Sequence, residues 1–127
     1  MNSQQVCIFC ELPSERVIKQ TELSLVISDG FPVTPGHMLI LPRRHAETWF
    51  DLTAQEQQDA NELLMILQEQ HQQQDTSITG FNVGINCGIS AGQTVMHCHI
   101  HLIPRRVGDC ADPRGGVRGV IAEKQRY

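Results

Sequence analysis

No stretch of this sequence is apolar for long enough to cross a lipid bilayer, which takes about 20 residues in a helix. The first residues, MNSQQVCIFCEL, also lack the basic start and the long apolar stretch of a signal peptide. We therefore expect a cytoplasmic protein that does not enter a membrane. Internal repeats and long linkers are absent as well, and 127 residues suffice for one hydrophobic core. We expect a single domain.

The sequence also has no overall excess of positive charge. Its formal net charge is −4, which argues against general nucleic-acid binding. The charge is uneven, because residues 105–127 carry six basic and three acidic residues. We therefore distinguish a main region, residues 1–106, from a basic C-terminal tail of the same domain, residues 107–127. Such a tail either meets a small polyanion or docks on the acidic remainder of the chain, and the sequence leaves both possibilities open.

The five cysteines do not form the even set that a secreted, disulfide-bonded protein would use. We therefore expect reduced thiols. Only Cys7 and Cys10 are close together, with the CxxC spacing of many metal sites. A closed zinc site needs four ligands, so this pair alone is a weak signal.

The order of apolar and polar residues predicts several short strands and one long helix. Thr53 and Glu56 form the capping-box pattern of a helix start, and apolar residues at helical spacing continue to about His71. Strands are expected at residues 16–19, 23–28, 37–41 and 80–86, and again in the histidine-rich stretch after Gln93. Antiparallel strands with one long helix define the α+β class.

Three of the six histidines, His97, His99 and His101, occupy alternate positions in this last stretch. Alternate side chains of a strand lie on the same face, so the three imidazoles would be about 6.5 to 7 Å apart along it. The opposite face would be apolar and would pack on the helix: Met96, Cys98, Ile100 and Leu102. A row of histidines behind an apolar row indicates a function rather than a solvated surface.

Two kinds of chemistry use such a row. The imidazoles can ligate a transition metal, or one of them can attack phosphorus while its neighbours donate protons to phosphate oxygens. The residues just before the row favour the second, since Gly88, Gly92, Gln93 and Thr94 supply donors suited to an anion. The expected reaction is a double displacement, in which a phospho-histidine forms and water then cleaves it.

Residues 97–103, HCHIHLI, resemble the His-φ-His-φ-His-φ-φ signature of the histidine triad (HIT) superfamily of nucleotide hydrolases and transferases. Residues 35–42, PGHMLILP, are similar to the family's upstream strand, and residues 91–95, AGQTV, to its phosphate loop. The resemblance covers about residues 7–106. It implies a five-stranded antiparallel sheet with one long helix and a short helix, and a homodimer formed through the long helix and a strand.

The resemblance also implies roles for single residues. His99 matches the nucleophile that becomes nucleotidylated, and His101 the residue that bonds the α-phosphate or the scissile oxygen. The implied substrate-binding residues are Asp29 at the ribose hydroxyls, His37 in support of the nucleophilic site, and Asn86, Gln93 and Thr94 at the phosphate oxygens or the leaving group. Four apolar residues either line a purine pocket or belong to the ordinary core: Phe9, Leu25, Ile27 and Leu39.

Many bacterial-type members of the family hold zinc with an N-terminal CxxC, a histidine after the upstream strand and the first histidine of the triad. Carried over, the zinc ligands are Cys7, Cys10, His45 and His97. A closed site of this kind has no open position and would be structural. The alternative is a pair of reduced cysteines without a metal.

We therefore expect a nucleotidyl hydrolase that attacks the α-phosphate of adenine dinucleoside polyphosphates and releases AMP. AGQTV before the triad and PRRVGD after it look closest to the fragile-histidine-triad-like branch of dinucleoside polyphosphate hydrolases. The alternatives are a nucleoside phosphoramidase of the AMP-lysine type, a nucleotide-binding regulatory protein, and an enzyme whose triad itself binds the metal. The phosphoramidase branch often has a tryptophan near its C-terminus, whereas the single tryptophan here is Trp49.

Overall fold

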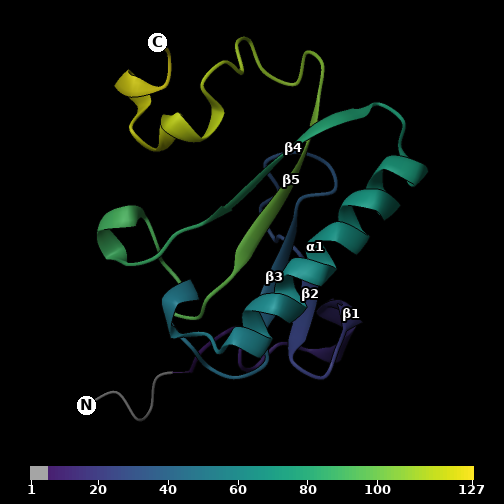
Figure 1. Ribbon diagram of the computed structural model, residues 1–127, viewed down its shortest axis with the longest axis vertical. Helices are drawn as coiled ribbons and strands as arrows, with labels where there is room; N and C mark the ends of the chain where they lie inside the picture. Colours follow the sequence, from purple (N-terminus) through teal and green to yellow (C-terminus); the bar gives the residue numbers. More distant parts are fainter. Residues whose placement is uncertain (1–5) are drawn as a thin grey trace.

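The computed structural model describes residues 6–127, so the first five residues of the predicted region 1–106 lie outside the described part. The chain forms a five-stranded antiparallel sheet in the order β1-β2-β3-β5-β4, with one long helix, α1, across one face (Figure 1). The bounds are Val17–Gln20 for β1, Ser24–Ser28 for β2, Met38–Pro42 for β3, Ala54–Gln74 for α1, Ile78–Ile85 for β4 and Ile100–Arg106 for β5. The predicted α+β class, with a five-stranded antiparallel sheet and one long helix, is confirmed.

The start of α1 is the predicted one. The Thr53 side chain accepts a hydrogen bond from the backbone N–H of Glu56 (3.1 Å), and the Glu56 carboxylate accepts one from the backbone N–H of Thr53 (2.8 Å). Because these two bonds satisfy otherwise unpaired N–H groups, they fix the first turn. The helix continues to Gln74, three residues beyond the predicted end.

The core lies between α1 and the sheet. Ala60, Leu63 and Leu67 of α1 are buried against Val26, Ile40, Ile100 and Leu102 of the three central strands. Burying one such aliphatic side chain contributes about 1.5–3 kcal/mol, so this layer holds the helix on the sheet. Within the described residues, no helix combines the length and the apolar character that a membrane crossing requires.

The histidine-rich stretch is a strand only in its second half, which corrects the prediction. β5 begins at Ile100, where pairing with β3 starts, so His97 and His99 precede the strand. The backbone N–H of Cys98 instead donates to the carbonyl of Ala46 (2.7 Å), which draws this segment away from β3. Cys98 accordingly packs on Ala46 and Leu52 rather than on the helix.

Residues 107–127 form a folded segment beside β4, drawn in yellow-green to yellow in Figure 1. It contains two short 3-10 helices, Gly116–Val120 and Ala122–Lys124. Gly115 has a φ of +89°, and a Cβ there would lie 1.7 Å from the carbonyl oxygen of Gln125. Only glycine permits this close approach of two backbone segments.

Candidate active site and metal centre

The two histidines predicted to carry the chemistry have imidazoles oriented by different neighbours. Nδ1 of His99 lies 2.8 Å from the backbone carbonyl oxygen of His97. A carbonyl can only accept a hydrogen bond, so Nδ1 of His99 carries the proton and Nε2 keeps the lone pair. The His99 side chain is largely buried, and the Phe9 ring packs edge-on against it at 5.1 Å. His99 therefore presents an unprotonated nitrogen in a fixed orientation.

A chain of hydrogen bonds orients His101 the other way. The backbone N–H of Val33 donates to Nδ1 of His37 (3.0 Å), so neutral His37 carries its proton on Nε2. That Nε2 lies 2.9 Å from Nδ1 of His101 and donates to it. Neutral His101 must then carry its own proton on Nε2. One histidine of the pair thus offers a lone pair, and its neighbour offers a proton.

Asp29 lies against this second chain. Its Oδ1 accepts a hydrogen bond from the backbone N–H of Phe31 (2.8 Å), while Oδ2 lies 3.3 Å from Nε2 of His37 and 3.9 Å from Nδ1 of His101. Burial lowers the pKa of His37, and the Asp29 charge offsets part of that effect. Burial also lowers the pKa of His101, as do His99 and His37, again against the effect of Asp29. Both imidazoles are therefore neutral at pH 7.

The loop before the triad holds the predicted phosphate-binding residues in two different settings. Gln93 is 3% exposed, and its side chain is bonded within the protein: Oε1 accepts from the N–H of Gly88 (2.7 Å), and Nε2 donates to the carbonyls of Glu47 (2.6 Å) and Val95 (3.1 Å). Its side chain therefore fixes the shape of the loop. Thr94 is exposed on the same loop.

Four of the predicted residues share one cavity. Its volume is about 650 Å³, and its lining includes Asp29, His37, Asn86 and His101 together with parts of β4 and of residues 107–127. The structure therefore brings together side chains from the ends of three strands and from one loop. His99 lies outside this lining, next to His101 at 5.2 Å between ring centroids.

The four apolar residues for which a purine pocket was considered belong to one packed cluster. Phe9, Ile27 and Leu39 are buried together, and Leu25 packs against them. None of these four side chains lines the cavity. This arrangement favours the ordinary-core interpretation.

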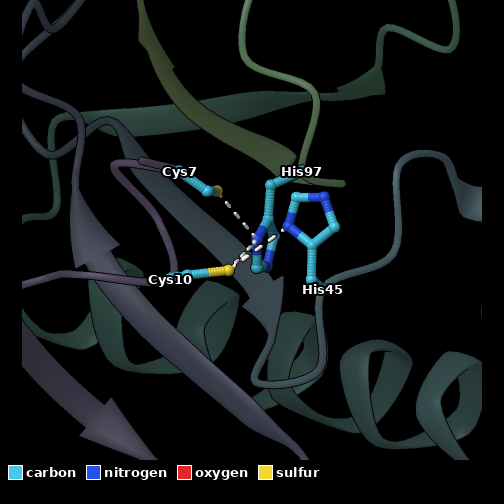
Figure 2. A group of neighbouring side chains, drawn as sticks. All are labelled: Cys7, Cys10, His45 and His97. Atoms are coloured by element: carbon cyan, nitrogen blue, oxygen red, sulfur yellow. Dashed lines mark hydrogen bonds between the residues drawn. The ribbon is translucent and has the colours of Figure 1, made fainter. Parts of the chain in front are cut away.

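Cys7, Cys10, His45 and His97 converge on one point from three segments of the chain (Figure 2). Nδ1 of His97 lies 3.4 Å from the sulfur of Cys7 and 3.4 Å from that of Cys10, and Nδ1 of His45 lies 3.2 Å from the sulfur of Cys10. Sulfur and nitrogen ligands of a tetrahedral zinc ion lie about 3.6 Å apart, given Zn–S of about 2.3 Å and Zn–N of about 2.0–2.1 Å. The predicted residues fit a metal site.

The lone pairs in this group also point the right way. Nε2 of His97 lies 2.8 Å from the carbonyl oxygen of Pro42, so it carries the proton and leaves Nδ1 free toward both sulfurs. This is the backbone hydrogen bond that orients many metal-binding histidines. None of the five cysteines, all of which lie in the described part, forms a disulfide.

Three features of the site were not predicted from the sequence. The Val33 N–H that orients His37, the Glu47 carbonyl that holds Gln93, and the Pro42 carbonyl that orients His97 are all backbone groups. Backbone groups carry no side-chain signature. The proline and glycine content of residues 30–36 was the one signal that a shaped loop precedes His37.

Comparison with known proteins gives the same family as the triad. The HIT domain family model matches residues 11–108. The bis(5'-nucleosyl)-tetraphosphatase [asymmetrical] of Schizosaccharomyces pombe is 35% identical over 105 residues, which cover 82% of this chain and 57% of that protein. The bis(5'-adenosyl)-triphosphatase of Dictyostelium discoideum is 39% identical over 92 residues, which cover 70% of this chain and 59% of that protein. The chain therefore spans less than two thirds of either enzyme.

Among solved structures, a Zn-bound histidine triad family protein from Mycobacterium smegmatis superposes with a TM-score of 0.75 at 31% identity, over 84% of this chain and 79% of that one. The family model, the relatives and the fold agree with the triad and its loop. This chain belongs to the HIT domain family.

Proposed function

We propose that this protein is a nucleotidyl hydrolase, which attacks the α-phosphate of adenine dinucleoside polyphosphates through a covalent nucleotidyl-histidine and releases AMP. One observation carries the proposal: His99 presents a lone pair beside a proton on His101. The phosphatase names of the two relatives support this choice of substrate.

In the first step, the lone pair on Nε2 of His99 forms a bond to the α-phosphorus, and the bond from phosphorus to the leaving oxygen breaks. The N–H on Nε2 of His101 donates a hydrogen bond to that oxygen and stabilises the charge that it gains, and the nucleoside polyphosphate leaves as its anion. His37 donates to Nδ1 of His101 along the 2.9 Å contact and so keeps this N–H directed at the leaving oxygen.

In the second step, water attacks the nucleotidyl-histidine. The new oxygen–phosphorus bond forms as the bond to Nε2 of His99 breaks, one proton of the water passes to solvent, and His99 regains its lone pair. AMP and the original protonation states result. The roles proposed for the other residues follow the family pattern: Asn86, Thr94 and the loop held by Gln93 stabilise phosphate oxygens, and Asp29 bonds the ribose hydroxyls.

We further propose that Cys7, Cys10, His45 and His97 hold a structural zinc ion. A zinc ion with four protein ligands would contribute folding free energy, and it would tie the N-terminal segment that carries Cys7 and Cys10 to His97. We also expect residues 1–106 and the tail to form one domain, and the protein to be a cytoplasmic homodimer through α1 and β4. β4 is one of the two outer strands of the described sheet, the other being β1, and it directly follows α1 in the chain, which supports this pairing.

The test is a chromatographic assay of the purified protein with diadenosine triphosphate, diadenosine tetraphosphate and AMP-lysine, each offered separately. We expect AMP from the dinucleotides, no turnover by His99→Ala, and retained nucleotide binding by that variant. Mass spectrometry of rapidly quenched wild-type protein should show one added nucleotidyl group on His99.

The other outcomes identify the other functions. Cleavage of AMP-lysine alone would make the protein a phosphoramidase, and binding without any turnover would make it a regulatory protein. Appreciable turnover by His99→Ala would exclude the covalent mechanism. Val107→Ser is a matched control, because Val107 is exposed and lies outside the cavity lining.

A further inference from the structure

The cavity beside His101 has two apolar walls whose side chains are mostly exposed. Phe31 and Val33, on the loop between β2 and β3, are 92% and 70% exposed. Val117 and Val120, on the C-terminal segment, are 63% and 78% exposed. All four line the same cavity. Two segments about 85 residues apart thus bring exposed apolar side chains to one space, which is typical of a ligand site.

The arginines around this cavity are already paired. Arg105 is the arginine in its lining, and it makes two hydrogen bonds with Asp109 (2.8 and 2.8 Å) and one with Asn82 (2.7 Å). This guanidinium holds the pKa of Asp109 well below its usual range, so the pair persists across physiological pH.

The arginines of residues 107–127 are paired in the same way. Arg126 and Arg114 lie 2.9 and 3.7 Å from the Asp112 carboxylate, and the Arg118 guanidinium lies 4.7 Å above the Tyr127 ring. Two of the three arginines of the tail thus share the Asp112 carboxylate, and the third stacks on Tyr127. Of the two interpretations of the tail, a polyphosphate site and a docked segment, the structure favours the second.

The position of the cavity assigns it to one half of the substrate. In phosphoryl transfer, the attacking and leaving atoms are roughly in line across the phosphorus. The leaving group must therefore extend away from His99, toward the side where His101 offers its proton. The cavity lining includes His101 and not His99, so it lies on the leaving-group side.

We propose that this cavity is the leaving-group subsite and that it takes a flat aromatic heterocycle, such as the second nucleobase of a dinucleotide, between Phe31 and Val33 on one side and Val117 and Val120 on the other. The inference rests on the proposed function and adds to it the residues that hold the second nucleoside. Apolar walls favour an aromatic ring, while the amides of Asn82 and Gln125 in the lining can bond the polar edge of a heterocycle.

A polyanion is a poor occupant of the same space. Asp29 contributes a carboxylate to the lining, and the charge of Arg105 is shared with Asp109. A leaving group that consists only of phosphates would bring negative charge to apolar walls without an unpaired cation. The subsite should therefore recognise the end of the substrate rather than the phosphate chain.

The test compares diadenosine tetraphosphate with adenosine 5'-tetraphosphate, which have the same number of phosphates and differ in the second nucleoside. We expect wild-type protein to favour the dinucleotide in kcat/KM by about tenfold or more, the size of a modest apolar contact. Val117→Ser and Phe31→Ser, on opposite walls, should each lower that ratio, while Val107→Ser should leave it unchanged. Arg114→Gln should leave the ratio unchanged too, whereas a polyphosphate site would lose activity with it. Thermal denaturation of each variant checks that it is folded.

Binding separates this inference from the proposed function. His99→Ala protein titrated with each of the two compounds should bind the dinucleotide more tightly, and Val117→Ser added to it should remove the difference. If wild-type protein hydrolyses neither compound, the proposed function fails, and the binding titration still tests the subsite. Equal affinity for both compounds, or a ratio unaffected by Val117→Ser and Phe31→Ser, would overturn the subsite even if AMP is released.

Discussion

Nε2 of His37 lies 2.9 Å from Nδ1 of His101, and the carboxylate of Asp29 lies 3.3 Å from the same Nε2. The one N–H of neutral His37 therefore faces both the His101 imidazole and the Asp29 carboxylate, while Nδ1 of His37 accepts a hydrogen bond from Val33. The consequence is that the proton on His101 depends on two groups that need not touch the phosphorus. Substitutions of Asp29 and His37 can therefore test how the His101 proton is positioned, separately from how the substrate is bound.

The first prediction concerns pH. Burial lowers the pKa of both His37 and His101, and Asp29 raises both, so the neutral forms that the mechanism needs prevail above these lowered values. The charges of His99 and His37 also lower the pKa of His101. Activity should therefore be lost as pH falls through the lowered pKa values. Asp29→Asn removes a carboxylate that favours protonation, so the acid limb should move to lower pH.

The measurement is kcat/KM for diadenosine triphosphate across the acid range, for wild type and Asp29→Asn. Asp29→Asn is the matched variant, because it removes the charge and keeps an amide that can bond the ribose. Asp29→Ala removes both the charge and the bond to the ribose. An acid limb that stays in place or moves to higher pH in Asp29→Asn would contradict the coupling between Asp29 and the two histidines.

The second prediction concerns Gln93, whose amide bonds Gly88, Glu47 and Val95 inside the protein. Gln93→Ala should lower the free energy of unfolding by about 1–3 kcal/mol, because it leaves buried backbone groups unpaired. It should also lower kcat, since the loop loses its shape. Urea denaturation and steady-state kinetics measure the two effects. Thr94→Ala, on the exposed neighbour, should leave stability nearly unchanged, and equal destabilisation by both variants would be evidence against this role.

The third prediction concerns the ion pair that holds the start of α1. Glu56 is buried and pairs with Arg44 at 2.8 Å, and hydrogen bonds from Arg44 and Thr53 lower its pKa despite the opposing effect of burial. A carboxyl whose pKa is lower in the folded state stabilises the fold above its ordinary pKa of about 4.5. That contribution is lost as pH falls through the lowered value.

Glu56→Gln should therefore be less stable than wild type at pH 7, and the difference should shrink in acid. Chemical denaturation at a series of pH values gives the free energy of unfolding of both proteins. Glu62→Gln, on an exposed part of the same helix, provides the control. A difference between Glu56→Gln and wild type that does not change with pH would show that the carboxylate charge is not what stabilises the helix start.

Local signals in the sequence predicted local structure well. The capping box could be predicted because its two residues, Thr53 and Glu56, are only three positions apart, and the structure contains it. The start of β5 could not be found in this way, because it depends on the Ala46 carbonyl, which lies 52 positions before Cys98. A hydrogen bond between distant backbone groups leaves no pattern in the residues that it joins.

The site shows the same division. The alternation of His97, His99 and His101 indicated a functional row, and the residues just before it favoured phosphorus chemistry over metal binding. The family resemblance named the Cys and His residues that the structure gathers. The charge of the tail was visible as a count of residues, but its pairing with Asp109 and Asp112 was not. Composition reports how many charges a segment has, and only the fold reports which of them are already neutralised.

The last prediction concerns the metal site. Cys10→Ser should bind less zinc than wild type by atomic absorption and should melt at a lower temperature, because a structural zinc ion contributes folding free energy. Chelation should lower the melting temperature of wild type toward that of Cys10→Ser and change the variant little. Cys110→Ser is the control, since Cys110 is an exposed thiol outside the cluster. The zinc content of the protein and its melting temperature are both independent of turnover, so the site is tested even if the substrate is another. Equal melting temperatures for zinc-supplied wild type and Cys10→Ser would leave these four residues as a pair of reduced thiols beside two histidines.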